Sequence, residues 1–121
     1  MAYVDGFILP VPVANLDRYR REARKAGRIW IKHGALQYVE SVADDVPTGK
    51  VTDFQRSVKL KDGETVVFAF AVYKSRKHRD EVMKKVMADP ALKMDPGAAP
   101  FDSKRMFWGG FSSFIDLKAD E

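Results

Sequence analysis

One apolar stretch decides the fold of this 121-residue chain: Val66-Val67-Phe68-Ala69-Phe70-Ala71-Val72. Because every position in it is apolar, both faces of the predicted strand must be covered, which is typical of a central strand in a sheet. Helices can cover one face. So short a chain has too little material left for the other face, so we expect a second subunit there, and the sequence predicts a homodimer.

The segments around this stretch predict a sheet that contains a hairpin. Residues 54–60 and 64–73 are both strand-like, and they flank Asp62-Gly63, a dipeptide suited to a tight turn. Residues 35–43 also alternate as a strand does, and residues 44–53 are loop-like. The pattern is compatible with one interrupted strand over 35–43 and 54–60 and also with two separate strands.

Two helices are predicted, one before these strands in the sequence and one after them. The first begins after Asn15, a suitable N-cap, and ends at Gly34, which can adopt the left-handed conformation of a C′ residue. The second follows Ser75 and ends at Asp89-Pro90. Its predicted inner stripe consists of Arg79, Val82, Met83, Val86 and Met87.

Both ends of the chain predict strands. Residues 3–12 are rich in strand formers and end at prolines, and a last strand spans about residues 104–117 after a turn-rich connection at 94–100. The paired Gly109-Gly110 in it suggests a bulge or a close backbone approach. The sequence therefore predicts a single α+β domain over residues 1–121, with the order β-α-β-β-α-β and an antiparallel sheet.

Composition narrows the class of protein further. The 21 Lys and Arg residues exceed the 17 Asp and Glu residues, but acids are interspersed among them along the helices, which indicates a solvated face and disfavours nucleic-acid binding. The absence of cysteine fits a reducing cytoplasm. The apolar run Phe7-Ile8-Leu9 is interrupted at once by Pro10, so we expect neither a signal peptide nor a membrane span.

Several motifs carry a resemblance to a known family. They include Tyr3-Val4-Asp5-Gly6-Phe7, His33-Gly34-Ala35-Leu36, Lys85-Val86-Met87-Ala88-Asp89-Pro90 and Gly109-Gly110-Phe111. With these motifs the chain resembles the YbaA-like family of uncharacterised bacterial proteins, which is similar to the dimeric α/β barrel superfamily. That resemblance implies a ferredoxin-like fold and a homodimer in which two sheets face each other, with small ligands often bound between sheet and helices.

Two titratable residues are candidates for proton transfer. His33 lies on the apolar stripe of the first helix, and histidine is the residue type best suited to proton transfer at neutral pH, although a histidine at a helix C-terminus is more often structural. Asp5 shares a strand face with Tyr3 and Phe7 and needs a partner if that face is buried. Arg56, Arg105 or His33 could supply it, and a structural ion pair is the favoured interpretation.

The candidate ligand-binding residues are Tyr38, Glu40, Tyr73 and Trp108. Tyr38 and Glu40 share one face of a strand, and the other two join them if the strands align, although aromatic residues at this spacing are more often core. No histidine and cysteine spacing typical of a metal site occurs, and no glycine-rich phosphate loop precedes a helix, so no metal or cofactor is predicted.

These residues favour a dimeric protein that binds a small, aromatic or carboxylate-bearing molecule between sheet and helices. The enzyme alternative is a cofactor-independent monooxygenase or isomerase that uses the same cavity, with His33 or Asp5 moving a proton. A third hypothesis is binding of RNA or another polyanion by the basic face of the first helix. That face contains Arg21, Arg24, Lys25, Arg28 and Lys32.

Overall fold

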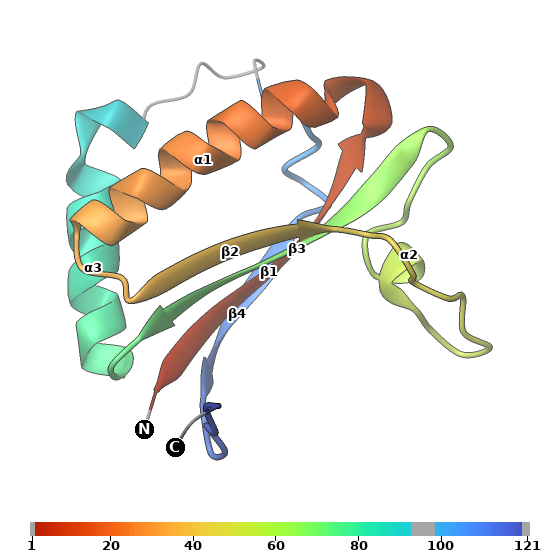
Figure 1. The fold of residues 1–121 in the computed structure, drawn as a ribbon. Helices are drawn as coiled ribbons and strands as arrows, with labels where there is room; N and C mark the ends of the chain where they lie inside the picture. The colour runs from red at the N-terminus through yellow and green to blue at the C-terminus, as the bar shows by residue number, and fades with distance from the viewer. Residues whose placement is uncertain (1, 93–98, 120–121) are drawn as a thin grey trace.

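A computed structural model describes residues 2–92 and 99–119. Its strands are β1 (Tyr3–Pro12), β2 (Gln37–Val42), β3 (Glu64–Tyr73) and β4 (Phe107–Ser112). Its helices are α1 (Leu16–Lys32), α2 (Phe54–Ser57) and α3 (Arg76–Ala88), with short 3-10 turns η1 (Val13–Asn15) and η2 (Pro90–Leu92). The strands form one antiparallel sheet in the order β2-β3-β1-β4, and α1 and α3 lie on one side of it (Figure 1). The α+β class and the central position of β3 are confirmed.

The ends of the two long helices are largely as predicted. Gly34 has φ of +114°, and the Ser75 side chain accepts a hydrogen bond from the His78 backbone N–H at 3.1 Å, which caps α3. The Asn15 side chain does not cap α1, because its Nδ2 donates to the carbonyl of Pro100 at 3.2 Å. Met87 was expected on the inner stripe of α3, but its side chain is exposed, since it lies about 100° around the helix from Val86.

The predicted strand at 54–60, and with it the hairpin, is wrong. Asp53 instead starts the helical turn α2, because its Oδ1 accepts a hydrogen bond from the Arg56 backbone N–H at 2.7 Å. β3 also has only two edges, and β2 and β1 occupy both. The turn at Gly63, with φ of +81°, therefore leads from α2 into β3 rather than between two strands.

The last strand is shorter than predicted and has no bulge. β4 pairs with β1 one residue to one, including Gly6 with Gly109 and Asp5 with Gly110. A side chain at Gly110 would collide with the Tyr3 hydroxyl and the Arg79 guanidinium, so the glycine permits a close approach. Most of the predicted connection 94–100 falls on residues 93–98, which lie outside the described residues.

The core lies on the helix-covered face of the sheet and consists of two clusters. The first contains Tyr3, Ile29, Trp30, Ala35, Ala71, Tyr73, Val82 and Val86. The second contains Leu9, Val11, Tyr19 and Val67. Strand alternation places these side chains on one face, and α1 contributes to both clusters because it runs along the sheet (Figure 1).

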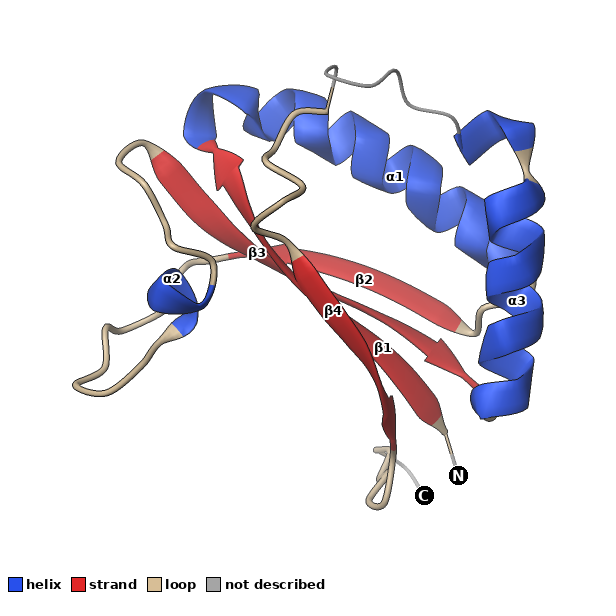
Figure 2. Ribbon diagram, turned by 180° about the vertical axis from the view of Figure 1, so that it is seen from behind, coloured by secondary structure: helices blue, strands red, loops and turns tan. Residues whose placement is uncertain are grey.

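The opposite face of the sheet is apolar and largely uncovered within this chain. Phe68, Phe107 and Phe111 point to that side and are 43%, 46% and 66% exposed. α2 lies on the same side near one end of the sheet (Figure 2), where the Phe54 ring packs edge-on against Phe68 at 6.4 Å. The cover expected on both sides of β3 is thus only partly present within the chain.

Candidate functional site

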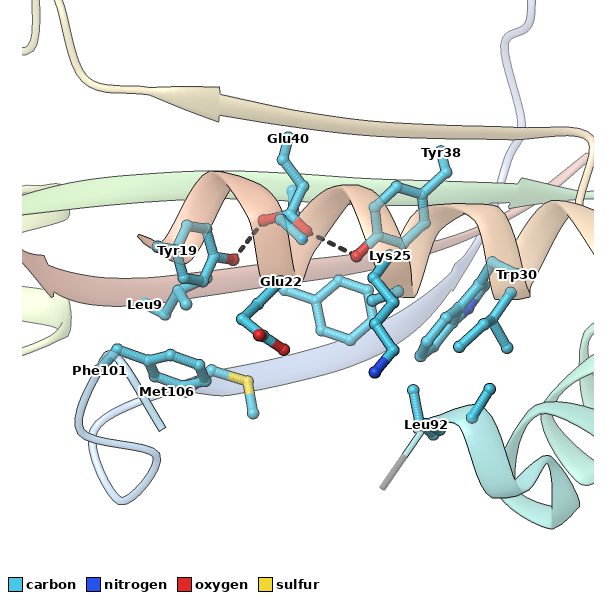
Figure 3. A pocket seen from close by; sticks show the side chains of 16 residues that line it. Leu9, Tyr19, Glu22, Lys25, Trp30, Tyr38, Glu40, Leu92, Phe101 and Met106 are labelled. Carbon is cyan, nitrogen blue, oxygen red and sulfur yellow. Dashed lines mark hydrogen bonds between the residues drawn. The ribbon is translucent and has the colours of Figure 1, made fainter. Parts of the chain in front are cut away.

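A cavity of about 260 Å³ lies between α1 and the sheet, between the two core clusters (Figure 3). Its wall is mostly apolar, with ring faces or edges from five aromatic residues. These are Phe7, Tyr19, Trp30, Tyr38 and Phe101. Small side chains leave the space open, because Ala23 and Ala26 of α1 face Ala69 of β3 across it.

One carboxylate stands in this apolar wall. Glu40 Oε1 accepts a hydrogen bond from the Tyr19 hydroxyl, and Glu40 Oε2 accepts one from the Tyr38 hydroxyl at 2.6 Å (Figure 3). We call these three residues the Glu40 cluster. It joins α1 to β2, because Tyr19 comes from the helix while Tyr38 and Glu40 are two residues apart on the strand and share a face.

The tyrosines of the Glu40 cluster are firmly protonated. Burial raises the pKa of Tyr19 above its ordinary value of 10.0, and the negative charge of Glu40 raises it further. The same two causes raise the pKa of Tyr38. Both hydroxyls therefore keep their protons at any physiological pH, and each proton is committed to Glu40.

The absence of a side chain at Gly27 lets the Tyr38 ring lie against α1. A Cβ atom at Gly27 would lie 2.7 Å from Tyr38 Cδ1, which is closer than real side chains approach. The Tyr38 ring in turn packs at 5.6 Å from the ring of Trp30. The missing side chain at Gly27 thus decides where the Tyr38 hydroxyl lies.

One acidic and one basic side chain lie at the mouth of the cavity. Glu22 and Lys25 of α1 line it, three residues apart on the helix, and their charged ends project towards Met106 and Leu92 (Figure 3). Inside the mouth, the polar side-chain atoms of the wall belong to the Glu40 cluster and to the indole of Trp30.

A second carboxylate, Asp5, lies on the same sheet face outside the cavity. It is 1% exposed, and within residues 2–92 and 99–119 neither of its oxygens has a hydrogen-bond partner. Burial raises the pKa of Asp5 above its ordinary value, while the nearby Tyr73 hydroxyl and the Arg79 guanidinium act in the opposite direction without cancelling it.

Arg79 of α3 is the charged partner of Asp5. Its Nε lies 3.5 Å from Asp5 Oδ1, its Nη2 donates to the Tyr3 hydroxyl at 3.0 Å, and the guanidinium lies 5.1 Å from the centre of the Tyr3 ring. We call Tyr3, Asp5, Tyr73 and Arg79 the Asp5 cluster. Asp5 does not line the cavity beside α1, and it lines neither of two open grooves that run along the same helix.

The partners that the sequence suggested for Asp5 are wrong, because each has a different acid. Arg56 pairs with Asp53 at 3.6 Å, and Arg105 pairs with Glu64 at 2.6 Å and with Asp102 at 3.0 Å. His33 Nε2 lies 2.7 Å from Asp89 Oδ2. α3 crosses the sheet at the end where Asp5 lies, which explains why an inner residue of that helix is the partner.

The His33 contact joins the end of α1 to the residue that follows α3. The Ala91 backbone N–H and then His33 lower the pKa of Asp89 to about 2, so this carboxylate is ionised at neutral pH. His33 does not line the cavity.

Of the four predicted ligand-binding residues, Tyr38 and Glu40 line the cavity and two do not. Tyr73 is fully buried, and its hydroxyl accepts a hydrogen bond from Trp30 Nε1 at 3.0 Å. Trp108 stacks on Phe7 at 6.3 Å and faces Arg79 at 6.0 Å. Both lie on the helix-covered face of the sheet, outside the cavity wall.

Sequence reasoning did not single out Tyr19 or Gly27. Both lie on the buried face of α1, where the helical period by itself predicts only a core position. One signal was present, because a buried tyrosine hydroxyl requires a hydrogen-bond partner and Glu40 is an acid on the strand face that it shares with Tyr38.

The part of the chain that the structure describes contains neither a metal-binding cluster nor a membrane-spanning helix. Over 2–92 and 99–119, no group of three or more acidic or histidine side chains is placed to hold a metal ion. In the same ranges, no helix has the length and apolar character needed to cross a bilayer.

Comparison with known proteins places the chain in a family. Residues 2–103 match the model described as "Protein of unknown function (DUF1428)". The chain is 48% identical over 116 residues to "Uncharacterized protein YbaA" of Escherichia coli (strain K12) and of Shigella flexneri, covering 96% of this chain and 99% of each relative. The designed protein Foldit4 gives a TM-score of 0.47 at 8% identity, over 93% of this chain and 99% of that one. The chain belongs to the DUF1428 family, together with the YbaA proteins, as the motifs of its sequence suggested.

Proposed function

We propose that the chain binds a small organic molecule in the cavity between α1 and the sheet. The observation that carries this proposal is the apolar cavity with a doubly hydrogen-bonded carboxylate, Glu40, in its inner wall. Ligand sites are mostly apolar with a few fixed polar groups, and they commonly measure about 300–1,000 Å³. A space of about 260 Å³ is small on that scale, so the ligand is small as well.

We also propose that the chain is a homodimer with a ferredoxin-like fold. The sheet order β2-β3-β1-β4, with helices on one side, supports that fold. The uncovered aromatic residues Phe68, Phe107 and Phe111 support a second copy on the other side, because monomers rarely expose so large a contiguous apolar face. In that arrangement the ligand cavities lie outside the interface, one in each subunit.

The enzyme alternative, with His33 or Asp5 as the proton-transfer group, is less well supported. Both side chains already have partners, since His33 Nε2 lies 2.7 Å from Asp89 and Asp5 pairs with Arg79, and neither lines the cavity. A proton-transfer group must lie within hydrogen-bond reach of its substrate. Glu40 is the carboxylate that meets this condition on the inner wall.

Polyanion binding is a second candidate, and one observation favours it. An open groove along α1 is lined mainly by cations. They are Arg20, Arg21, Arg24, Lys25, Arg28 and Lys32, with Asp17 and Asp89 beside them. Binding of this kind weakens steeply with salt, so RNA affinity that is unchanged between about 50 and 200 mM salt would exclude it.

Native mass spectrometry of the protein purified from its host tests the cavity and the dimer together. We expect a dimer that carries an additional small mass. Ala26→Leu narrows the cavity and should remove that mass, whereas Ala88→Leu, at an exposed helical position, should retain it. The same added mass on the A26L variant would contradict the proposal, and a monomer would contradict the dimer.

A further inference from the structure

We infer that the ligand is a small aromatic molecule that presents a hydrogen-bond donor, a hydroxyl or an amine, to Glu40. This inference rests on the proposed function and names the class of its ligand. It depends on which polar atoms of the cavity wall are already engaged.

Among residues 2–92 and 99–119, the side-chain donors on the inner wall already donate to other protein atoms. The Tyr19 and Tyr38 hydroxyls both donate to Glu40, and Trp30 Nε1 donates to the Tyr73 hydroxyl behind the wall. A tyrosine has one hydroxyl proton and an indole has one N–H, so none of the three has a second proton to offer. The ammonium group of Lys25 is also a hydrogen-bond donor, but it lies at the mouth and not on the inner wall.

Acceptors, in contrast, remain available. An ionised carboxylate has about four lone-pair sites, and the two hydroxyls occupy one on each oxygen of Glu40. The oxygens of Tyr19 and Tyr38 can each accept one more hydrogen bond. The polar part of the wall therefore consists of acceptors and carries a negative charge.

A ligand carboxylate at this place would meet only acceptors and a like charge. Burying an unpaired polar group costs free energy, and a second carboxylate beside the first adds repulsion. A hydroxyl or an ammonium group forms a charge-assisted hydrogen bond instead. The hypothesis of a carboxylate-bearing ligand is thus disfavoured at the inner end, although Lys25 at the mouth is compatible with an anionic group there.

The rest of the wall favours an aromatic ligand. The rings of Trp30 and Tyr38 lie 5.6 Å apart at one side, and Phe7, Tyr19 and Phe101 supply further ring surface. Aromatic rings pack face to edge or offset against one another, and their faces also attract an ammonium group. Phenols and aromatic amines combine both features.

Binding of four ring compounds to the full chain tests the inference. The probes are 4-methylphenol, benzylamine, toluene and benzoate, and Trp30 fluorescence reports binding in a Trp108→Phe background, since the chain has only these two tryptophans. We expect the phenol and the amine to bind about tenfold more tightly than toluene, and benzoate to bind most weakly.

A variant of the acceptor tests the cause of this order. In Glu40→Gln the amide NH₂ replaces one acceptor oxygen, so one tyrosine proton is released towards the cavity, and the preference for the phenol over benzoate should disappear. Glu81→Gln, at an exposed position of α3 that does not line the cavity, is the matched control and should keep the order. If the E40Q variant does not fold, Tyr38→Phe tests the same cause, because it frees one more lone pair of Glu40 and should increase the preference for the phenol over benzoate.

The outcomes separate the two proposals. Benzoate or toluene that binds as tightly as 4-methylphenol overturns the donor inference and leaves the cavity as a ligand site. If none of the four probes perturbs Trp30, both the ligand class and the proposed binding function fail. An unchanged order in E40Q overturns the role of Glu40.

Discussion

Glu40 and Asp5 are two carboxylates on the same covered face of one sheet, yet their surroundings differ. Glu40 lies opposite Ala69 on β3, and Asp5 lies opposite Ala71, two residues further along the same strand. Glu40 accepts two hydrogen bonds from neutral hydroxyls and borders a cavity. Asp5 has a cation at 3.5 Å, forms no hydrogen bond with the described residues, and borders no described pocket.

The difference separates a group available to a ligand from a group committed to the fold. Neutral donors hold Glu40 in place without neutralising it, so its charge and its remaining lone pairs can act on a bound molecule. The guanidinium of Arg79 offsets the charge of Asp5 instead, and α3 is thereby fixed to β1. Burial alone does not distinguish the two carboxylates, whereas the type of partner and the adjoining space do.

The largest expected effect breaks the Asp5 cluster. Arg79→Met should lower the free energy of unfolding at pH 7 by about 3 kcal/mol, because it leaves a buried carboxylate without its cation. Urea unfolding followed by circular dichroism measures the change. The matched control is Arg76→Met on the same helix, since the Arg76 side chain is 75% exposed and its Nε lies 3.9 Å from Asp80 Oδ2, beyond hydrogen-bond distance.

A double-mutant cycle shows whether this loss comes from Asp5. In an Asp5→Asn background the R79M substitution should cost clearly less, because the asparagine carries no charge. Equal costs in both backgrounds would mean that Arg79 acts through its other contacts, with Tyr3, Asp80 and Trp108.

Two glycines allow each cluster to be disturbed by a single methyl group. Gly110→Ala should cost about 2 kcal/mol, because the new Cβ displaces Tyr3 and Arg79. Gly27→Ala should cost less, since the gain in helix propensity, about 1 kcal/mol, offsets part of the collision with Tyr38. It should nevertheless weaken ligand binding, because Tyr38 moves relative to Glu40, whereas G110A should leave binding unchanged.

The control for both glycines is Gly6→Ala, because a Cβ at Gly6 would meet no atom within 4 Å. We expect its free energy of unfolding to stay within about 0.5 kcal/mol of the wild type or to rise slightly. If G27A binds the probes as tightly as the wild type, the position of Tyr38 does not determine the site.

Much of this comparison follows from local sequence patterns. The alternation in 35–43 puts Tyr38 and Glu40 on one strand face, and the strand predicted at 3–12 puts Asp5 on a face with Tyr3 and Phe7, because each pattern depends only on near neighbours. The glycines at 34 and 110 were likewise interpretable, since only a close approach or a left-handed turn requires them.

What failed depends on neighbours that are distant in sequence. Residues 54–60 have the alternation of a strand, but no edge of β3 is free for them, and Asp53 starts a helical turn instead. The partner of Asp5 depends on how α3 crosses the sheet, and the cavity depends on small residues from α1 and β3 that meet across it. Tyr19 could have been linked to Glu40 only through the unmet hydrogen-bonding needs of both.

The smallest expected effect is a difference in the sign of pH dependence between two buried acids, Asp5 and Glu64. The Glu64 carboxylate receives two hydrogen bonds from Arg105, at 2.7 and 2.6 Å, and these lower the pKa of Glu64 below its ordinary value of 4.5. The folded state thus favours ionised Glu64, and its contribution is complete above about pH 4.5 and is lost as the pH falls through the folded pKa. Asp5 behaves in the opposite way, since its folded pKa is raised above 3.8. Its contribution is complete below that value and is lost as the pH rises through the folded pKa.

Urea unfolding between pH 3 and pH 7 should therefore show two opposite trends. Glu64→Gln should cost up to about 1 kcal/mol at pH 7 and progressively less in acid, because protonated Glu64 no longer attracts Arg105 more than glutamine does. Asp5→Asn should gain stability at pH 7, because burial raises the pKa of Asp5, and this gain should vanish near pH 3, where Asp5 is protonated in both states. If D5N loses stability at neutral pH, the attraction between Asp5 and Arg79 outweighs the cost of burying Asp5. Asp5 and Glu40 would then differ in the cavity that adjoins Glu40, and not in how well the charge of each carboxylate is compensated.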